Sequence, residues 1–166
     1  MKRLLLSLIF VMALGACAHG GGSSSAARTL VIPNPVRHAL QPIKVAPELA
    51  ESSAPAVFET SLCNRMFEYN KGLMMCADSV RAILEHQQQA AVLGNAPFSL
   101  ETAYEMLDAP RRVDITAQKA GDRVSLTVAL LQGDKTLARF QYLLKPDASD
   151  VLERAEEAAI AVLETR

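Results

Sequence analysis

The chain has 166 residues, of which 50% are hydrophobic, 21% charged and 5% aromatic, and its formal net charge is -1. This length is sufficient for one domain and leaves little room for two. The composition is too apolar for a chain that is disordered throughout, and the near-neutral charge argues against non-specific nucleic-acid binding.

The N-terminus is typical of an export signal. Lys2 and Arg3 precede an apolar run of eleven residues, LLLSLIFVMAL, which ends at Leu14. A membrane-spanning helix needs about 20 apolar residues, so residues 1–16 are predicted to be a cleaved signal peptide. Their removal takes away two positive charges and leaves 15 Lys and Arg against 18 Asp and Glu, a net charge of -3.

The residues before the cleavage point, Leu14-Gly15-Ala16-Cys17, resemble the lipobox of bacterial lipoproteins. The resemblance implies that the Cys17 thiol carries a diacylglycerol, which anchors the protein stably in a membrane. Ordinary secretion with a chance cysteine is the alternative. Residue 18 is Ala instead of Asp. In a Gram-negative organism this favours lipid anchoring in the outer membrane, facing the periplasm; in a Gram-positive organism the anchor would be the plasma membrane.

Two further segments precede the predicted globular part. Residues 17–28 comprise the lipidated cysteine and a Gly/Ser-rich tether, AHGGGSSSAA, with a span of roughly 17 Å. Residues 29–52 form a Pro-rich lead, in which either Thr29–Ile32 or Ile43–Val45 supplies the first core strand. His38 lies in this lead and is expected to be exposed.

Residues 53–166 are predicted to be an α/β globular domain. Ser53 is a candidate cap of the first helix, and the segment Asp147–Asp150 supplies the cap of the last one. From Arg112 the apolar period changes from helical spacing to two. The expected elements are a helix over 53–70, a strand over 73–77, helices over 78–94 and 99–107, strands over 112–117, 124–130 and 136–144, and a helix over 151–163.

These elements predict a single-domain α+β, or mixed α/β, fold with a mainly antiparallel three-stranded C-terminal meander, extra N-terminal strands and packing helices. The polar side chains that alternate with the apolar set of the meander are a candidate interaction surface: Asp114, Thr116, Ser125 and Thr127. The expected packing stripes of the first and last helices are Val57, Phe58, Leu62, Met66 and Tyr69, and Val151, Leu152, Ala155, Ala159, Val162 and Leu163.

Cys63 and Cys76 remain once Cys17 is lipidated. An even pair of cysteines in an exported chain predicts a disulfide. Two free buried thiols are the alternative. A metal site is a weaker interpretation, because two cysteines without a nearby histidine pair do not complete a tetrahedral set.

Three segments together resemble a known group of envelope domains: FETSLCNRMFEYNKGLMMCA, SVRAILEHQQQAAVLG and RRVDITAQKAGDRVSLTVALLQGDKTLARF. The group includes the TolB amino-terminal domain, the curli-channel lipoprotein, flagellar assembly lipoproteins and the activator lipoproteins of penicillin-binding proteins. The resemblance covers roughly residues 55–165. It implies scaffolding, assembly or activation through contacts with an envelope protein partner.

The sequence contains no phosphate-binding loop, dinucleotide fingerprint, nucleophile elbow or zinc-protease motif. His86 is expected on the solvated side of its helix, and Arg111-Arg112 on the surface. The sequence therefore predicts a non-catalytic, lipid-anchored interaction or assembly module of a cell-envelope machine, without cofactor, metal or nucleic acid. A lipid-anchored protein that binds a small ligand or the cell wall is the alternative.

Overall fold

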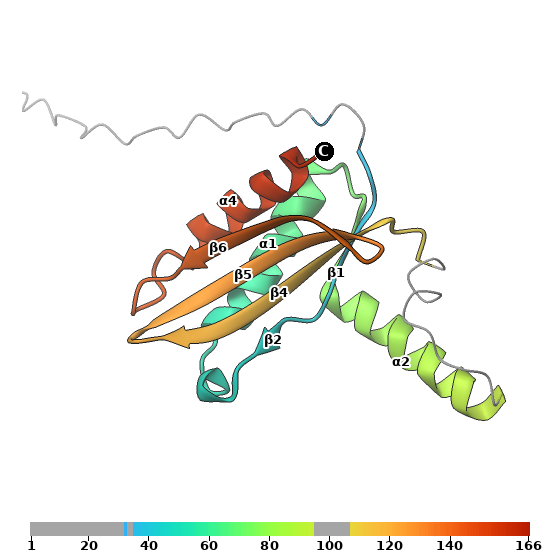
Figure 1. Ribbon diagram of the computed structural model, residues 1–166, viewed down its shortest axis with the longest axis horizontal. Coiled ribbons are helices and arrows are strands. Elements are labelled where there is room, and N and C mark those ends of the chain that lie inside the picture. Colours follow the sequence, from blue (N-terminus) through green and yellow to red (C-terminus); the bar gives the residue numbers. More distant parts are fainter. Residues whose placement is uncertain (1–31, 33–34, 95–106) are drawn as a thin grey trace, which may run out of the picture.

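The computed structural model describes residue 32, residues 35–94 and residues 107–166 (Figure 1). The signal peptide, Cys17, the tether and most of the expected helix over 99–107 lie outside the described residues. The elements are β1 His38–Leu40, β2 Lys44–Val45, the 3-10 helix η1 Pro47–Leu49, α1 Ala54–Tyr69, β3 Met74–Met75, α2 Ala77–Gly94, β4 Arg111–Ala120, β5 Arg123–Gln132, β6 Lys135–Leu143 and α4 Val151–Glu164.

Six strands form one mixed sheet in the order β3-β1-β4-β5-β6, and β2 pairs with β4 beyond the end of β1. The N-terminal strands are parallel to their neighbours, with His38 opposite Met74 on one side and Arg111 on the other. Strands β4, β5 and β6 run antiparallel, with Thr116 opposite Thr127 and Thr127 opposite Gln141. The sheet is therefore parallel in its N-terminal half and antiparallel in its C-terminal half.

The first core strand differs from both sequence candidates. It is β1, whose three residues are buried, whereas the 43–45 candidate gives the short β2 and the 29–32 candidate lies almost entirely outside the described residues. Pro42 separates β1 from β2, and both pair with β4. A proline lacks the N–H that a continuous strand would donate, so one long strand is divided into two short ones.

Helices α1 and α4 lie side by side on one face of the sheet (Figure 1). Between them and the strands lies the main core, which includes Phe58 and Leu62 from α1, Val162 from α4, and Ile115 and Val128 from the sheet. Each of these five side chains is at most 1% exposed. Helical periodicity predicts both helices correctly, because each presents one apolar stripe to this core.

Two members of the expected stripes are not part of the core. Val57 is 40% exposed and Leu152 is 60% exposed, whereas Ala158, which was not in the expected stripe, is fully buried.

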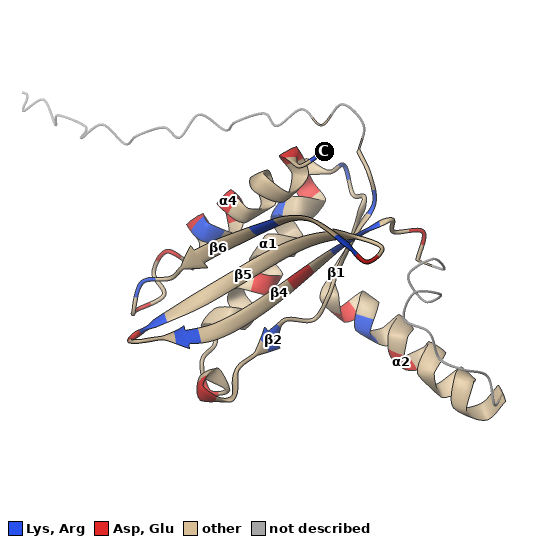
Figure 2. Cartoon of the chain, viewed as in Figure 1, with Lys and Arg blue, Asp and Glu red and all other residues tan. Residues whose placement is uncertain are grey.

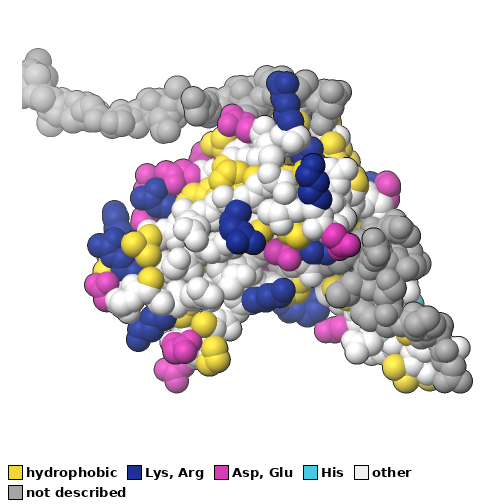
Figure 3. Space-filling view, in the orientation of Figure 1, with side chains coloured by type: hydrophobic (Ala, Val, Ile, Leu, Met, Phe, Trp, Pro, Cys, Tyr) yellow, Lys and Arg dark blue, Asp and Glu magenta, His cyan; other side chains and the backbone are white. Residues whose placement is uncertain are grey.

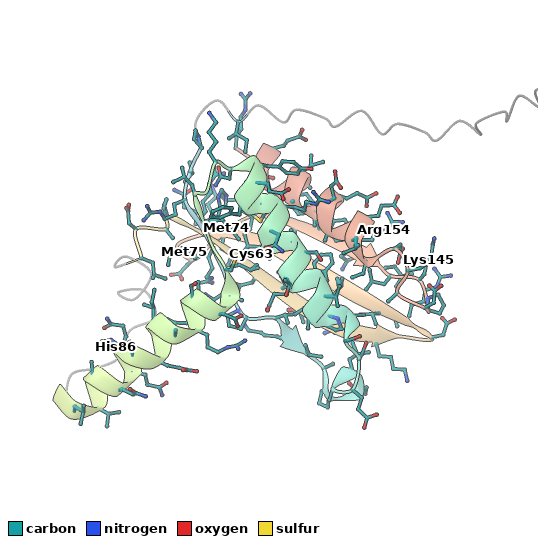
Figure 4. All side chains as sticks on the ribbon, turned by 180° about the vertical axis from the view of Figure 1, so that it is seen from behind. Cys63, Met74, Met75, His86, Lys145 and Arg154 are labelled. Atoms are coloured by element: carbon teal, nitrogen blue, oxygen red, sulfur yellow. A yellow bond between two sulfur atoms is a disulfide. The ribbon has the colours of Figure 1, made fainter. Side chains whose placement is uncertain are left out.

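Helix α2 packs differently from α1 and α4. Its first turns contact a small second cluster, in which Val80 packs with Ala39, Leu107 and Ala109. Ala39 and Leu40 are neighbours in a strand and therefore point to opposite faces, so α2 begins on the face opposite α1. The rest of α2 projects away from the sheet, and Val92 and Leu93 are 73% and 86% exposed (Figure 4).

A disulfide joins Cys63, in the third turn of α1, to Cys76, which follows β3. Their Cα atoms are 5.6 Å apart, within the range that a disulfide requires. Between them the chain reverses through Lys71 and Gly72, which have φ values of 53° and 80°. Gly72 suits this left-handed conformation because it has no side chain to clash there.

Candidate functional site

The face of the sheet opposite α1 and α4 is open over strands β4, β5 and β6 (Figure 3). Alternation along each strand sends one set of side chains to the core and the other to this face. The strand registers join the outward set into rows, such as Lys44-Thr116-Thr127-Gln141. We call this surface the sheet face. Its residues are Lys44, Arg112, Asp114, Thr116, Gln118, Arg123, Ser125, Thr127, Ala129, Leu131, Arg139, Gln141 and Leu143.

Charge on the sheet face is predominantly positive (Figure 2). Lys44, Arg112, Arg123 and Arg139 provide four positive charges, and Asp114 provides the one negative charge. The Arg112 Nε atom lies 3.0 Å from the Asp114 carboxylate, and these side chains are 29% and 24% exposed. The ion pair holds both groups in a fixed position near the start of β4.

The four polar residues predicted as a surface lie together on this face. Asp114, Thr116, Ser125 and Thr127 are partly exposed, and none is buried in the core. Sequence reasoning missed Arg139 and Gln141. Their alternation is harder to see because the register between β5 and β6 shifts at Leu130 and Leu131, so one residue of β6 is skipped.

The expectation that His38 is exposed is wrong: it is 2% exposed, because β1 lies between β3 and β4. Its Nδ1 atom lies 2.7 Å from the Val36 carbonyl oxygen. Burial is the main cause that lowers the pKa of His38 to about 4; the Val36 carbonyl opposes this effect and the positive charge of Arg111 adds to it. The ring is therefore neutral near pH 7 and donates through Nδ1.

Asn70 completes the polar cluster around His38. Its Nδ2 group donates to the carbonyl oxygens of Val36, at 2.7 Å, and Leu73, at 2.8 Å. Asn70 follows the last residue of α1, so its side chain links the end of that helix to the segments that enter β1 and β3. Full burial and these backbone contacts indicate a structural role for the His38–Asn70 pair.

Glu59 is a further polar side chain with a structural role. It accepts a hydrogen bond from the backbone N–H of Ile43, at the break between β1 and β2. Burial raises the pKa of Glu59, and the hydrogen bond from Ile43 and the charge of Arg81 oppose that effect. Glu59 therefore replaces part of the pairing that the interrupted strand loses.

The remaining titratable candidates are dispersed. His86 is exposed on α2, as expected (Figure 4). Arg111 is half-buried and donates to the carbonyl oxygen of Thr165 at 2.8 Å. Within the described ranges, neither His38 nor His86 is paired with a serine, threonine or cysteine side chain, as nucleophilic catalysis would require.

The described surface includes two shallow hollows that are open to solvent. One, of about 580 Å³, lies beside the β4–β5 turn and is lined by Ala46, Pro47, Glu48, Gln118, Lys119 and Gly121. The other, of about 460 Å³, lies along the projecting part of α2. Among the described residues, no three His, Cys, Asp or Glu side chains are grouped as metal ligands, and no helix has the length and apolar character to span a bilayer.

No family model and no curated protein matches this chain. Among solved structures, the chain is similar to PelC from Paraburkholderia phytofirmans, solved as a dodecamer, with 12% identity over 77% of this chain and 86% of that chain at a TM-score of 0.43. A second PelC dodecamer structure gives a TM-score of 0.45. TolB from Acinetobacter baumannii is similar at 15% identity, over 79% of this chain and 29% of that chain, at a TM-score of 0.42.

Proposed function

We propose that the protein is a non-catalytic interaction module, anchored by a lipid on Cys17 in the outer membrane, that assembles with an envelope protein partner through the sheet face. The observation that carries the proposal is the sheet itself. One face is covered by α1 and α4, whereas the opposite face presents rows of polar and charged side chains to solvent.

The composition of the sheet face supports protein contact. Ion-paired Arg112 and Asp114 and the hydroxyl groups of Thr116 and Thr127 supply hydrogen-bonding groups of both kinds. Leu131 and Leu143 add apolar area beside them. Arginine, polar groups and scattered apolar side chains are the ordinary composition of a non-obligate protein interface.

The anchor is supported by the sequence alone. The LGAC segment follows an eleven-residue apolar run, and a tether precedes the first described residues. A short tether keeps the sheet face close to the membrane surface, where a partner in the same envelope is at high effective concentration.

The test is site-specific photocrosslinking in the native host with Cys17 intact. A photoreactive amino acid at Thr127 is expected to capture one defined envelope protein, and the same group at exposed Gln88 on α2 is the control. Crosslinking that is equal at both positions contradicts the proposed surface. Loss of an activity on Ala substitution of His86, with folding and partner binding intact, contradicts the non-catalytic role.

A further inference from the structure

The two faces of the molecule carry opposite charge. The sheet face carries Lys44, Arg112, Arg123 and Arg139 against Asp114, a net charge of +3. Helices α1 and α4 contain two basic and six acidic residues, a net charge of -4. The chain as a whole is almost neutral, with 17 basic and 18 acidic residues, so this segregation does not follow from an excess of one charge.

The acidic side chains of the helices are accessible. Glu153 and Glu157 are exposed on α4, and Glu156 retains 45% of its side-chain exposure. Arg65 and Arg154, the basic residues of the two helices, are paired with Glu68 at 3.1 Å and Glu157 at 2.8 Å. The negative charge of this helical face is therefore only partly compensated within the molecule.

Each face also has an exposed apolar side chain. Leu143 is 45% exposed at the end of β6 on the sheet face, and Leu152 is 60% exposed at the start of α4. Burial of these apolar side chains between two such surfaces would stabilise the contact beyond its electrostatic attraction.

We infer that the sheet face binds the acidic helical face, formed by α1 and α4, of a second copy of this chain. The inference rests on the proposed function, because it names the partner of the proposed docking surface. The two faces lie on opposite sides of the molecule, so the contact is head-to-tail, and a pair of copies retains one free sheet face and one free helical face. Such contacts continue into a ring or a linear series.

Edge-to-edge pairing of β6 is the competing mode, and its charge disfavours it. β6 carries Lys135 and Arg139 and no acidic residue. Antiparallel pairing of two β6 strands would bring these like charges together. Charged side chains commonly protect an edge strand from such pairing. Face-to-face docking of two sheet faces would likewise oppose positive charge with positive charge.

The test is sedimentation equilibrium of the full chain carrying Cys17→Ser, which removes the lipid and leaves residues 35–166 unchanged. Self-association is expected at 0.1 M salt and should weaken at least about tenfold at 1 M salt, because the screening length falls from about 10 Å to about 3 Å. Either Arg139→Glu or Glu153→Lys alone should weaken association about tenfold, and a mixture of the two variants should restore it. The matched control is Arg81→Glu on exposed α2, which changes the charge equally outside both faces and should leave association unchanged.

A monomer at every concentration in 0.1 M salt would overturn the inference, as would association that neither charge reversal weakens or that their mixture does not restore. These results are distinguishable from a failure of the proposed function. If the chain remains monomeric while a photoreactive group at Thr127 still crosslinks one envelope protein, the inference of a second copy as partner is wrong. The proposed interaction role of the sheet face is then retained.

Discussion

Protonation of His38 should make the protein markedly less stable in mild acid. Burial lowers the pKa of His38 from its ordinary value of 6.5 to about 4 in the folded protein. Between these two values the unfolded chain binds a proton that the folded protein does not. The free energy of unfolding therefore rises with pH across this window and falls as pH is lowered. This difference in pKa lowers the free energy of unfolding, relative to neutral pH, by about 2 kcal/mol at pH 5 and by about 3 kcal/mol at pH 4.

Other groups titrate in the same range, so the assay compares variants. Burial raises the pKa of Glu59, which has the opposite effect, because this carboxyl group takes up its proton in the folded state first. The informative variant is His38→Asn, which retains a donor for the Val36 carbonyl and cannot be protonated. The control is His86→Asn on the exposed surface of α2.

Urea unfolding is measured for each protein at intervals from pH 7 to pH 4. The difference between wild type and His38→Asn should shrink by about 3 kcal/mol as pH falls, because only the wild type loses the contribution of a neutral imidazole. The His86→Asn profile should parallel that of the wild type. Parallel profiles for wild type and His38→Asn would refute the assignment of His38 as a buried neutral base.

Three further substitutions test the disulfide, the core and the anchor. Replacing Cys76 by Ala should lower the free energy of unfolding by about 3 kcal/mol in urea titrations, and an unchanged midpoint in reductant would contradict a stabilising bond. Leu62→Ala should cost about 2–5 kcal/mol, because its side chain is fully buried, whereas Val57→Ala should cost under about 1 kcal/mol; equal losses by thermal unfolding would contradict the packing. Cys17→Ser should abolish labelling by a fatty-acid probe and membrane retention without changing the unfolding curve of residues 35–166, and label persisting in the variant would disprove lipidation.

The sequence was most informative about elements in which one residue pattern continues for at least three helical turns or three alternating residue pairs of a strand. Helices α1 and α4 were predicted within a few residues, because their buried side chains repeat with a period near 3.6. Strands β4 and β5 alternate strictly, and Val113, Ile115, Leu126 and Val128 are buried as that alternation requires. Long periodic elements are predictable because local pattern and tertiary burial agree.

The central strand β1 was missed for a tertiary reason. It has three residues, all buried, so it has no alternation to detect. It also includes a histidine and lies between prolines 35 and 42. What makes it a strand is pairing with β3 and β4, which are distant in sequence. A buried parallel strand is specified by its neighbours more than by its own composition.

The candidate site could be predicted only in part. Asp114, Thr116, Ser125 and Thr127 follow directly from the alternation of β4 and β5. Lys44 belongs to the same surface through the parallel pairing of β2 with β4, which no local pattern encodes. The position of Arg139 on the sheet face depends on the register shift beside Leu130. The positive charge of the sheet face therefore depends on strand pairings that bring residues from separate segments onto one surface.

The positions at which the described chain enters β1 and leaves α4 determine where the protein can be labelled without obstructing it. His38 is opposite Arg111 in the sheet, and Arg111 bonds to the Thr165 carbonyl, so both positions lie at one pole (Figure 1). A fluorescent protein fused after Arg166 would therefore be placed beside the point at which the described chain enters β1. The turn at Gly121 and Asp122 lies at the opposite end of the strands and is exposed. It is the better place to insert an epitope for microscopy.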